Sequence, residues 1–157
     1  MSKKHNYTTT LKWTGNKGEG TKTYTAYERS YNLAAENKIP IDASSDPAFR
    51  GDPTKYNPEE FLLGALSSCH MLWYLHLCSD KKVIVLEYED KASATMVENP
   101  DGSGQFSEVI LRPRVLISEE SSILDAEKLH EKANKMCFIA RSCNFPVRHE
   151  PICIRKK

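Results

Sequence analysis

The residues best suited to chemistry in this 157-residue chain are its five cysteines: Cys69, Cys78, Cys137, Cys143 and Cys153. Their odd number argues against the disulfide framework of a secreted domain. No two of them form a CxxC pair, and none is spaced with a histidine as in a zinc finger, so a structural zinc site is not expected. Three interpretations remain: buried structural thiols, a redox pair, or one catalytic thiol.

Two of these cysteines, Cys69 and Cys137, fall on the apolar faces of separate predicted helices. One interpretation is core packing, because cysteine is often a small buried hydrophobic residue. The other is a redox pair. In such a pair one thiolate attacks an O–O bond, becomes a sulfenic acid and condenses with the second thiol to a disulfide. That chemistry requires a cation that holds the first thiol as a thiolate.

The cation near Cys69 must come from a side chain, because the dipole of a helix acts only over its first turn. His70 points about 100° away around the helix and His76 lies about two turns further along, so both are interpreted as packing or hydrogen-bonding residues. Arginine is a better candidate, since it is always charged and grips a carboxylate in a bidentate pair. Arg50 and Arg29 are the candidates, although either can be an ordinary surface arginine.

A long helix must position Cys69. Asn57 can cap it, Pro58 suits its first turn, and Glu59 and Glu60 suit its positive end, so we expect it to run to about Cys78. One face at helical spacing carries Leu62, Ala65, Cys69, Leu72, Trp73 and His76. The other faces are apolar or small as well, which is typical of a central helix. Its uncharged stretch, residues 61–77, is short for a membrane span.

The remaining elements predict a single α+β domain over residues 1–157. Strands are expected over residues 6–13 and 21–33, then a long loop over residues 37–56, and a last short strand over residues 146–155. Two strands over residues 83–98 and 104–118 are expected to meet at a turn, with Pro113 placing the second at an edge or a bulge. A second helix is expected from near Ser122, with Cys137 on its apolar stripe.

Composition limits the classes of partner. The chain has 22 Lys and Arg against 21 Asp and Glu, a net charge of +1, which argues against a nucleic-acid binder that neutralises phosphates. Hydrophobic residues make up 39% and charged residues 27%, which is typical of a globular domain. No apolar run of signal-peptide length follows Lys3 and Lys4, so we expect a cytoplasmic location and no membrane association.

Two segments then carry a resemblance to a known family. NPEEFLLGALSSCH resembles the N-P-E…C signature of the OsmC/Ohr family of osmotically inducible and organic hydroperoxide resistance proteins. KANKMCFIARSCNFPV resembles that family's second-cysteine helix. The resemblance implies an OsmC-like fold, with antiparallel sheets packed around two long central helices in an intertwined homodimer. His70 stands where the best-known peroxidases of the family have an apolar aromatic residue, which indicates a less-studied branch.

The activity that the resemblance implies is a thiol-dependent peroxidase that reduces organic hydroperoxides in oxidative stress defence. Cys69 matches the attacking cysteine, Cys137 the resolving cysteine, and Glu59 the glutamate that orients the family's catalytic arginine. Arg50 is favoured as that arginine and Arg29 is the reserve. An external dithiol, lipoyl-like in the family, would reduce the disulfide. No metal and no bound cofactor is implied.

Helix geometry adds one requirement. Glu59 and Cys69 lie about 15 Å apart along one helix, so a site that uses both must take Glu59 from a second chain, as in a homodimer. Leu72, Trp73, Phe49 and Phe138 are candidates to line a pocket for an alkyl chain, with core packing as the alternative role for each. The alternatives are a non-catalytic protein that binds a small apolar ligand, or a redox-sensing thiol protein on the same fold.

Overall fold

The structure is a computed structural model that describes residues 3–157 and confirms the α+β class. Contacts divide the chain into two compact units, residues 1–61 and 62–157. The elements in chain order are β1 (Thr10–Trp13), β2 (Tyr31–Ala34), β3 (Ile41–Ala43), η1 (Pro47–Phe49), α1 (Pro58–Asp80), β4 (Val85–Asp90), β5 (Ser93–Glu98), β6 (Gly104–Leu111), β7 (Pro113–Ile117), α2 (Ile123–Met136), η2 (Ala140–Ser142), β8 (Val147–His149) and β9 (Ile152–Arg155).

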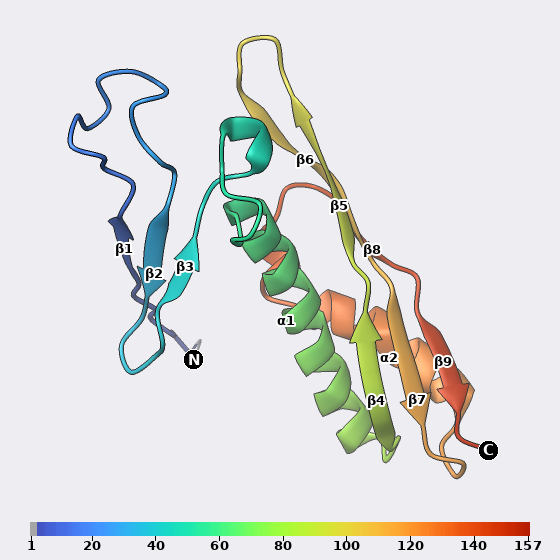
Figure 1. Ribbon diagram of the computed structural model, residues 1–157. Helices are drawn as coiled ribbons and strands as arrows, with labels where there is room; N and C mark the ends of the chain where they lie inside the picture. The colour runs from blue at the N-terminus through green and yellow to red at the C-terminus, as the bar shows by residue number, and fades with distance from the viewer. Residues whose placement is uncertain (1–2) are drawn as a thin grey trace. The chain divides into compact units, whose positions relative to one another are not determined.

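The N-terminal unit is built on an antiparallel sheet in the order β1-β2-β3 (Figure 1). The predicted strand over residues 21–33 is wrong except at its end, because residues 14–30 form an irregular loop. Side chains replace the strand ladder there: Asn16 Oδ1 accepts hydrogen bonds from the backbone N–H groups of Gly18, at 2.9 Å, and Gly20, at 3.0 Å. The expected loop over residues 37–56 also contains β3 and η1.

Helix α1 begins as the sequence predicts and ends two residues beyond Cys78. Asn57 Oδ1 accepts from the Glu60 N–H at 2.8 Å, and Glu60 Oε2 accepts from the Asn57 N–H at 3.1 Å. This reciprocal pair is a capping box that satisfies two N–H groups without partners inside the helix. By length and composition alone α1 is apolar enough to cross a bilayer, a criterion that the core helix of a folded domain also meets.

The face of α1 that enters the core differs from the face that helical spacing singled out. The buried side chains are Leu66, His70, Tyr74, Leu77 and Cys78. The predicted face instead lines an open pocket along most of its length. Because α1 is apolar or small on every side, periodicity identifies a central helix and leaves the choice between its faces open.

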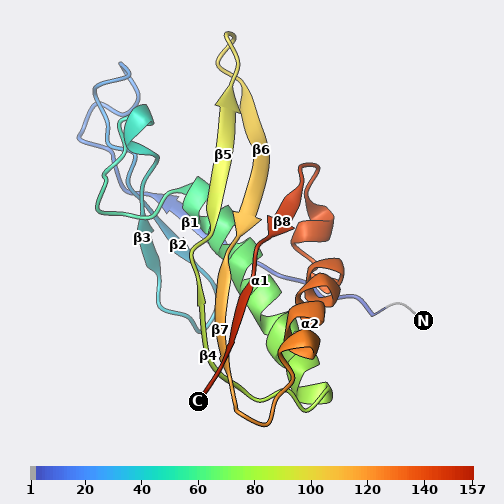
Figure 2. The ribbon, with the colours of Figure 1, turned by 90° about the vertical axis from the view of Figure 1, so that its right-hand side faces the viewer.

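The second unit carries two three-stranded sheets in the orders β4-β7-β9 and β5-β6-β8 (Figure 2). Each predicted strand, over residues 83–98 and 104–118, is broken in two and contributes to both sheets. Asp90 stabilises the break, since its carboxylate accepts from the Arg112 N–H at 2.6 Å and from Ser67 Oγ at 2.5 Å. Pro113 is the first residue of the middle strand β7, so its predicted edge position is wrong, and at a strand start its missing N–H is tolerated.

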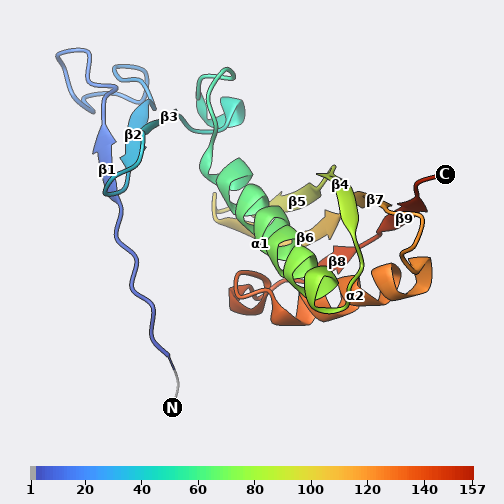
Figure 3. The same cartoon turned by 90° about the horizontal axis from the view of Figure 1, so that it is seen from below.

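Helix α2 starts as predicted, with Ser122 Oγ accepting from the Asp125 N–H at 3.2 Å. It ends at Met136, one turn earlier than a stripe reaching Ala140 requires, and Cys137 is its C-cap. As a crossover between the strand pairs, α2 makes β8 parallel to β6 and β9 parallel to β7. Both helices cover the same side of the β4-β7-β9 sheet (Figure 3).

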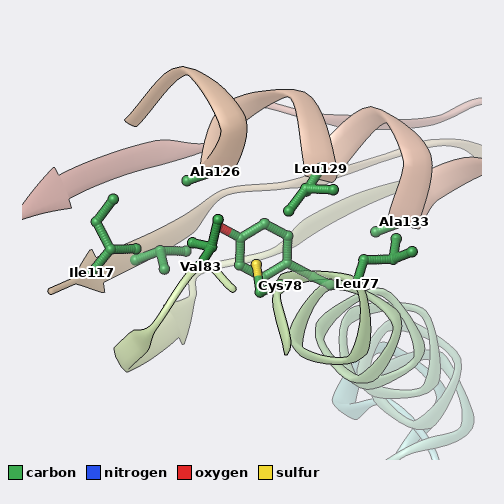
Figure 4. Packing of buried hydrophobic residues seen from close by; sticks show 9 residues of the cluster. Leu77, Cys78, Val83, Ile117, Ala126, Leu129 and Ala133 are labelled. Carbon is green, nitrogen blue, oxygen red and sulfur yellow. The ribbon is translucent and has the colours of Figure 1, made fainter. Parts of the chain in front are cut away.

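The main core lies between α1, α2 and this sheet. Leu77 and Cys78 of α1 face Ala126, Leu129 and Ala133 of α2 (Figure 4). Val83, Val115 and Ile117 complete the cluster from the strands and the turn before β4. Side chains of α1, α2 and the sheet therefore share a single buried cluster.

A polar pair lies within this helix contact. His70 Nε2 and His130 Nδ1 are 3.0 Å apart, both side chains are fully buried, and His130 stacks on Tyr74 with ring centroids 3.8 Å apart. Burial lowers the pKa of His70 to about 4, with a further contribution from His149. It lowers the pKa of His130 to about 3, with further contributions from His70 and His149. Both imidazoles are therefore neutral at pH 7.

Stability should fall as the pH drops from 6.5 toward 4. The unfolded chain protonates both histidines below pH 6.5 while the folded chain does not, so acid favours unfolding by about 1.4 kcal/mol per pH unit for each histidine. Urea unfolding between pH 7.5 and 4.5 measures this slope. The control is a His70→Leu/His130→Leu double variant, in which the carboxylates titrate as in wild type but the two histidines are gone. Its free energy of unfolding should depend less steeply on pH. Equal slopes for the two proteins would contradict the conclusion that both histidines are neutral in the folded chain.

Candidate active site

The structure brings Cys69 and Cys137 together in the second unit. Cys69 lies in the middle of α1, Cys137 caps the C-terminus of α2, and their thiols are near enough for Cys69 to raise the pKa of Cys137. All five cysteines are free thiols. Two thiols on separate helices at this spacing can exchange between a dithiol and a disulfide after a small local movement.

The environments of these two thiols differ. Cys69 is half-buried, whereas Cys137 is 1% exposed and its Sγ accepts from the Ala140 N–H at 3.4 Å. Burial, followed by the hydrogen bond to Cys69, raises the pKa of Cys137 to about 11, so it is a neutral thiol at pH 7. A reagent from solvent therefore meets Cys69 first, and Cys137 is placed to attack the modified Cys69.

Cys69 opens into an apolar pocket of about 590 Å³ that belongs wholly to the second unit. It is lined by Ala65, Ser68, Cys69, Leu72, Trp73, His76, Phe138 and Ile139. Trp73 packs edge-on against Phe138, with ring centroids 5.6 Å apart. Leu72 and Phe138 remain 62% and 67% exposed, so one side of the pocket is open.

The expected pocket residues Leu72, Trp73 and Phe138 lie in this lining, while Phe49 belongs to η1 of the N-terminal unit. His76, interpreted from sequence as a packing residue, also lines the pocket. Its Nε2 lies 3.6 Å from Asp80 Oδ2. The sequence did not predict three other residues of the pocket lining: Ala65, Ser68 and Ile139. Helical spacing from Cys69 and Leu72 could have identified Ala65 and Ser68, whereas Ile139 lies beyond the end of α2.

The two candidate arginines lie in the N-terminal unit, in different surroundings. Arg29 donates to the carbonyls of Tyr27, at 2.6 Å, and Tyr24, at 2.7 Å, and its guanidinium lies 4.2 Å from the centroid of each tyrosine ring. It stabilises the irregular loop. Arg50 is exposed and caps η1 with a φ of 67°. Its exposed side chain is the one available to a ligand.

Glu59 lies in the first turn of α1, and its Oε2 is buried with no hydrogen-bond partner among residues 3–157. Burial and the Glu59 carboxylate raise the pKa of Tyr31 in the same unit. Within the described residues no ion pair joins Glu59 to Arg50 or to Arg29, so the arginine–glutamate pair that the resemblance implies stays a prediction.

The other three cysteines have structural surroundings. Cys78 and Cys153 flank the Tyr74 hydroxyl, with 3.8 Å between that oxygen and Cys153 Sγ. Burial raises the pKa of Cys78 to about 11. Cys143 donates to the Ile139 carbonyl at 3.3 Å. Among the residues that the structure describes, no group of three His, Cys, Asp or Glu side chains could hold a metal ion.

Comparison with known proteins gives consistent matches. Residues 51–151 match the family model of the OsmC-like proteins. The chain is 30% identical over 144 residues to the uncharacterised protein YmaD of Bacillus subtilis, covering 88% of this chain and 86% of that protein.

Two solved structures illustrate the range of similarity. The OsmC-like protein VCA0330 of Vibrio cholerae is 30% identical, with a TM-score of 0.85 over 95% of this chain and 100% of its own. The organic hydroperoxide resistance protein OhrB of Bacillus subtilis is 14% identical, with a TM-score of 0.66 over 94% of this chain and 98% of its own. At that identity the likeness to OhrB shows a shared fold.

Alkylation of the native protein at pH 7.5 should modify Cys69 before Cys78 and Cys137. Cys69 borders the pocket, whereas Cys78 and Cys137 are almost fully buried and have pKa values near 11. Peptide mapping by mass spectrometry after timed iodoacetamide exposure should show Cys69 labelled at least about tenfold faster than either. Labelling in urea is the control, and faster native labelling of Cys137 would reverse the assigned roles.

Proposed function

The chain belongs to the OsmC-like protein family, and we propose that it is a cytoplasmic thiol-dependent peroxidase that reduces organic hydroperoxides in oxidative stress defence. The single observation that carries this proposal is the thiol pair, in which a half-buried Cys69 beside an apolar pocket neighbours the buried Cys137. Two thiols that served only to pack the core would need no access to a pocket.

The reaction balances with these two residues and a reductant. The Cys69 thiolate attacks the terminal oxygen of the hydroperoxide, the O–O bond breaks, and the alkoxide leaves as an alcohol after taking up a proton. Cys69 is then a sulfenic acid. The Cys137 thiol attacks that sulfur, water leaves, and a disulfide forms. An external dithiol, lipoyl-like or of similar chemistry, returns both cysteines to thiols by exchange.

The pocket supports an organic rather than an inorganic peroxide. Its wall next to Cys69 is formed by Leu72, Trp73 and Phe138, which suit an alkyl or aryl group. Burial of each methylene group against such a wall contributes about 0.8 kcal/mol to binding. Hydrogen peroxide has no apolar group to bury against this wall. The preference for an organic hydroperoxide over hydrogen peroxide therefore comes from its alkyl or aryl group.

The electrostatic part of the site is proposed to come from a second copy of the chain. The pocket lining contains no arginine or lysine, and along α1 Glu59 is too far from Cys69 to serve it. Arg50 and Glu59 would both come from the second copy, where the Glu59 carboxylate, which has no partner in the single chain, would hold the guanidinium that stabilises the thiolate and the developing alkoxide. Exposed apolar side chains in the N-terminal unit, such as Leu11 at 63% and Ile39 at 91%, support burial against such a copy.

Peroxide consumption with a dithiol reductant tests the activity. Wild-type protein should turn over cumene hydroperoxide much faster than hydrogen peroxide, and Cys69→Ser should abolish turnover because the attacking sulfur is gone. Cys143→Ser is the matched control, since that thiol lies outside the pocket lining, and it should retain activity.

The other outcomes separate the alternatives. Turnover no faster than that of free dithiol would reject the peroxidase. If the protein then binds a small apolar ligand in the pocket regardless of Cys69→Ser, a ligand-binding protein follows. Slow turnover with clean formation of a Cys69–Cys137 disulfide indicates a redox sensor.

Complementation tests Arg50 and the dimer together. Cys69→Ser and Arg50→Ala chains should each be inactive alone. Unfolded together in equal amounts and refolded, half of the dimers are mixed and each has one complete site, so about a quarter of wild-type activity should return. Arg29→Ala removes the contacts of Arg29 within the loop, so its main effect should be a lower free energy of unfolding. No recovery in a mixture that forms dimers would place Arg50 in the same chain as its cysteine.

A further inference from the structure

We propose that His70 and His130 are positioning residues, which hold α1 and α2 at the crossing where Cys69 meets Cys137 and so determine how readily the disulfide forms. The inference deepens the proposed function and rests on it only for the peroxide that oxidises Cys69. It gives a role to two buried side chains that take no direct part in the reaction.

The helices meet at two polar points with unequal spacing. Along α1, His70 and Cys69 are neighbours and their Cα atoms differ by about 1.5 Å along the axis. On the other helix, His130 and Cys137 are seven residues apart, about 10 Å or two turns. The histidine pair and the thiol pair are therefore adjacent on α1 but separated on α2. Two such contacts together fix the angle at which the helices cross. The histidine contact is therefore the second point that orients the thiol contact.

A hydrogen bond is suited to this task because it has a direction and a length. The apolar contacts around it, such as Ala133 against α1, tolerate a slide along the helix axis. The 3.0 Å bond between His70 Nε2 and His130 Nδ1 does not, because a shift of one residue moves the ring atoms out of reach. The remaining ring nitrogens, Nδ1 of His70 and Nε2 of His130, have no hydrogen-bond partner among residues 3–157, so the mutual bond is the one polar contact of the pair within these residues.

The rings are held from several elements. Tyr74 of α1 stacks on His130, and His149 of β8 lies with its ring centroid 5.6 Å from that of His70. Two other titratable groups stand behind them: Cys153 of β9 beside the Tyr74 hydroxyl, and Glu131 of α2 near His149. This packing keeps each ring in one plane, so the position of the polar atom is defined.

The step that depends on this placement is the closing of the disulfide. The sulfenic acid of Cys69 and the thiol of Cys137 combine, an S–S bond forms, the S–O bond breaks, and water leaves. In exchange with a dithiol or with glutathione the same S–S bond forms and breaks. Its equilibrium constant against glutathione measures the effective concentration of one thiol at the other, which a tilt of α2 lowers.

Side-chain isosteres give a matched test. The amide of glutamine reaches where histidine has Nε2, and the amide of asparagine lies where histidine has Nδ1. His70→Gln and His130→Asn therefore keep a polar atom at the bonded position, whereas His70→Asn and His130→Gln move it. The four variants and wild type are equilibrated in glutathione buffers at pH 7. The Cys69–Cys137 disulfide is quantified by alkylation and mass spectrometry.

The two variants that move the polar atom should lower the effective concentration about tenfold or more, equivalent to about 1.4 kcal/mol. The two that keep it should stay within about threefold of wild type. Equal values in all five proteins, or equal losses in all four variants, would overturn the proposal, because a merely structural role does not separate the two kinds of amide. His5→Gln, on an exposed residue, controls for histidine removal.

Two further readouts close the test. Near-UV circular dichroism reports whether each variant is folded. If the single variants do not fold, a His70→Leu/His130→Leu protein replaces both polar groups by apolar ones, and an unchanged effective concentration there also overturns the proposal. The glutathione equilibrium uses no peroxide. If the protein has no peroxidase activity but the two kinds of amide variant still differ in effective concentration, the proposed function is rejected and the positioning role of the histidines stands.

Discussion

The packing of α1 and α2 on one side of the same sheet is the constraint on which the rest of the second unit depends. Side chains of both helices share one buried cluster, and this shared core places Cys137, at the end of α2, beside Cys69 of α1. The contact is asymmetric, since α2 has one apolar stripe whereas α1 is apolar on every side. As a result α1 gives one face to the core and keeps another for the pocket.

This division explains why one helix can serve both stability and chemistry. Leu66, Tyr74 and Leu77 are sealed in the core, and one residue away around the helix Cys69 and Trp73 border an open apolar surface. An enzyme of the proposed kind needs its attacking thiol accessible and its resolving thiol protected, because an exposed second thiol would itself be oxidised or alkylated. The two environments follow from position: the middle of a half-covered helix for Cys69, and a buried helix end for Cys137.

The sequence predicts those parts of the structure that short-range chemistry determines. The cap at Asn57 and the cap at Ser122 each depend on a few neighbouring residues. The pairing of Cys69 with Cys137 was instead implied by the resemblance of two separate segments to one family. Long-range choices were not predictable from spacing. The broken strands depend on Asp90 reaching Arg112 and Ser67 from another element, and the irregular loop before β2 depends on Asn16 and Arg29 binding its backbone.

The two candidate arginines differ in the contacts that their side chains already make. Arg29 and Arg50 are equally charged, and sequence offers no reason why one guanidinium should be occupied. In the fold Arg29 has two carbonyl acceptors and two tyrosine faces, so drawing it into a thiol site would break four contacts and leave loop carbonyls unpaired. Arg50 loses nothing comparable when it turns toward a ligand, because its backbone is fixed by the cap of η1 while its side chain is exposed. Arg50, whose side chain is exposed, is therefore the one of the two that we propose for a site completed by a second copy.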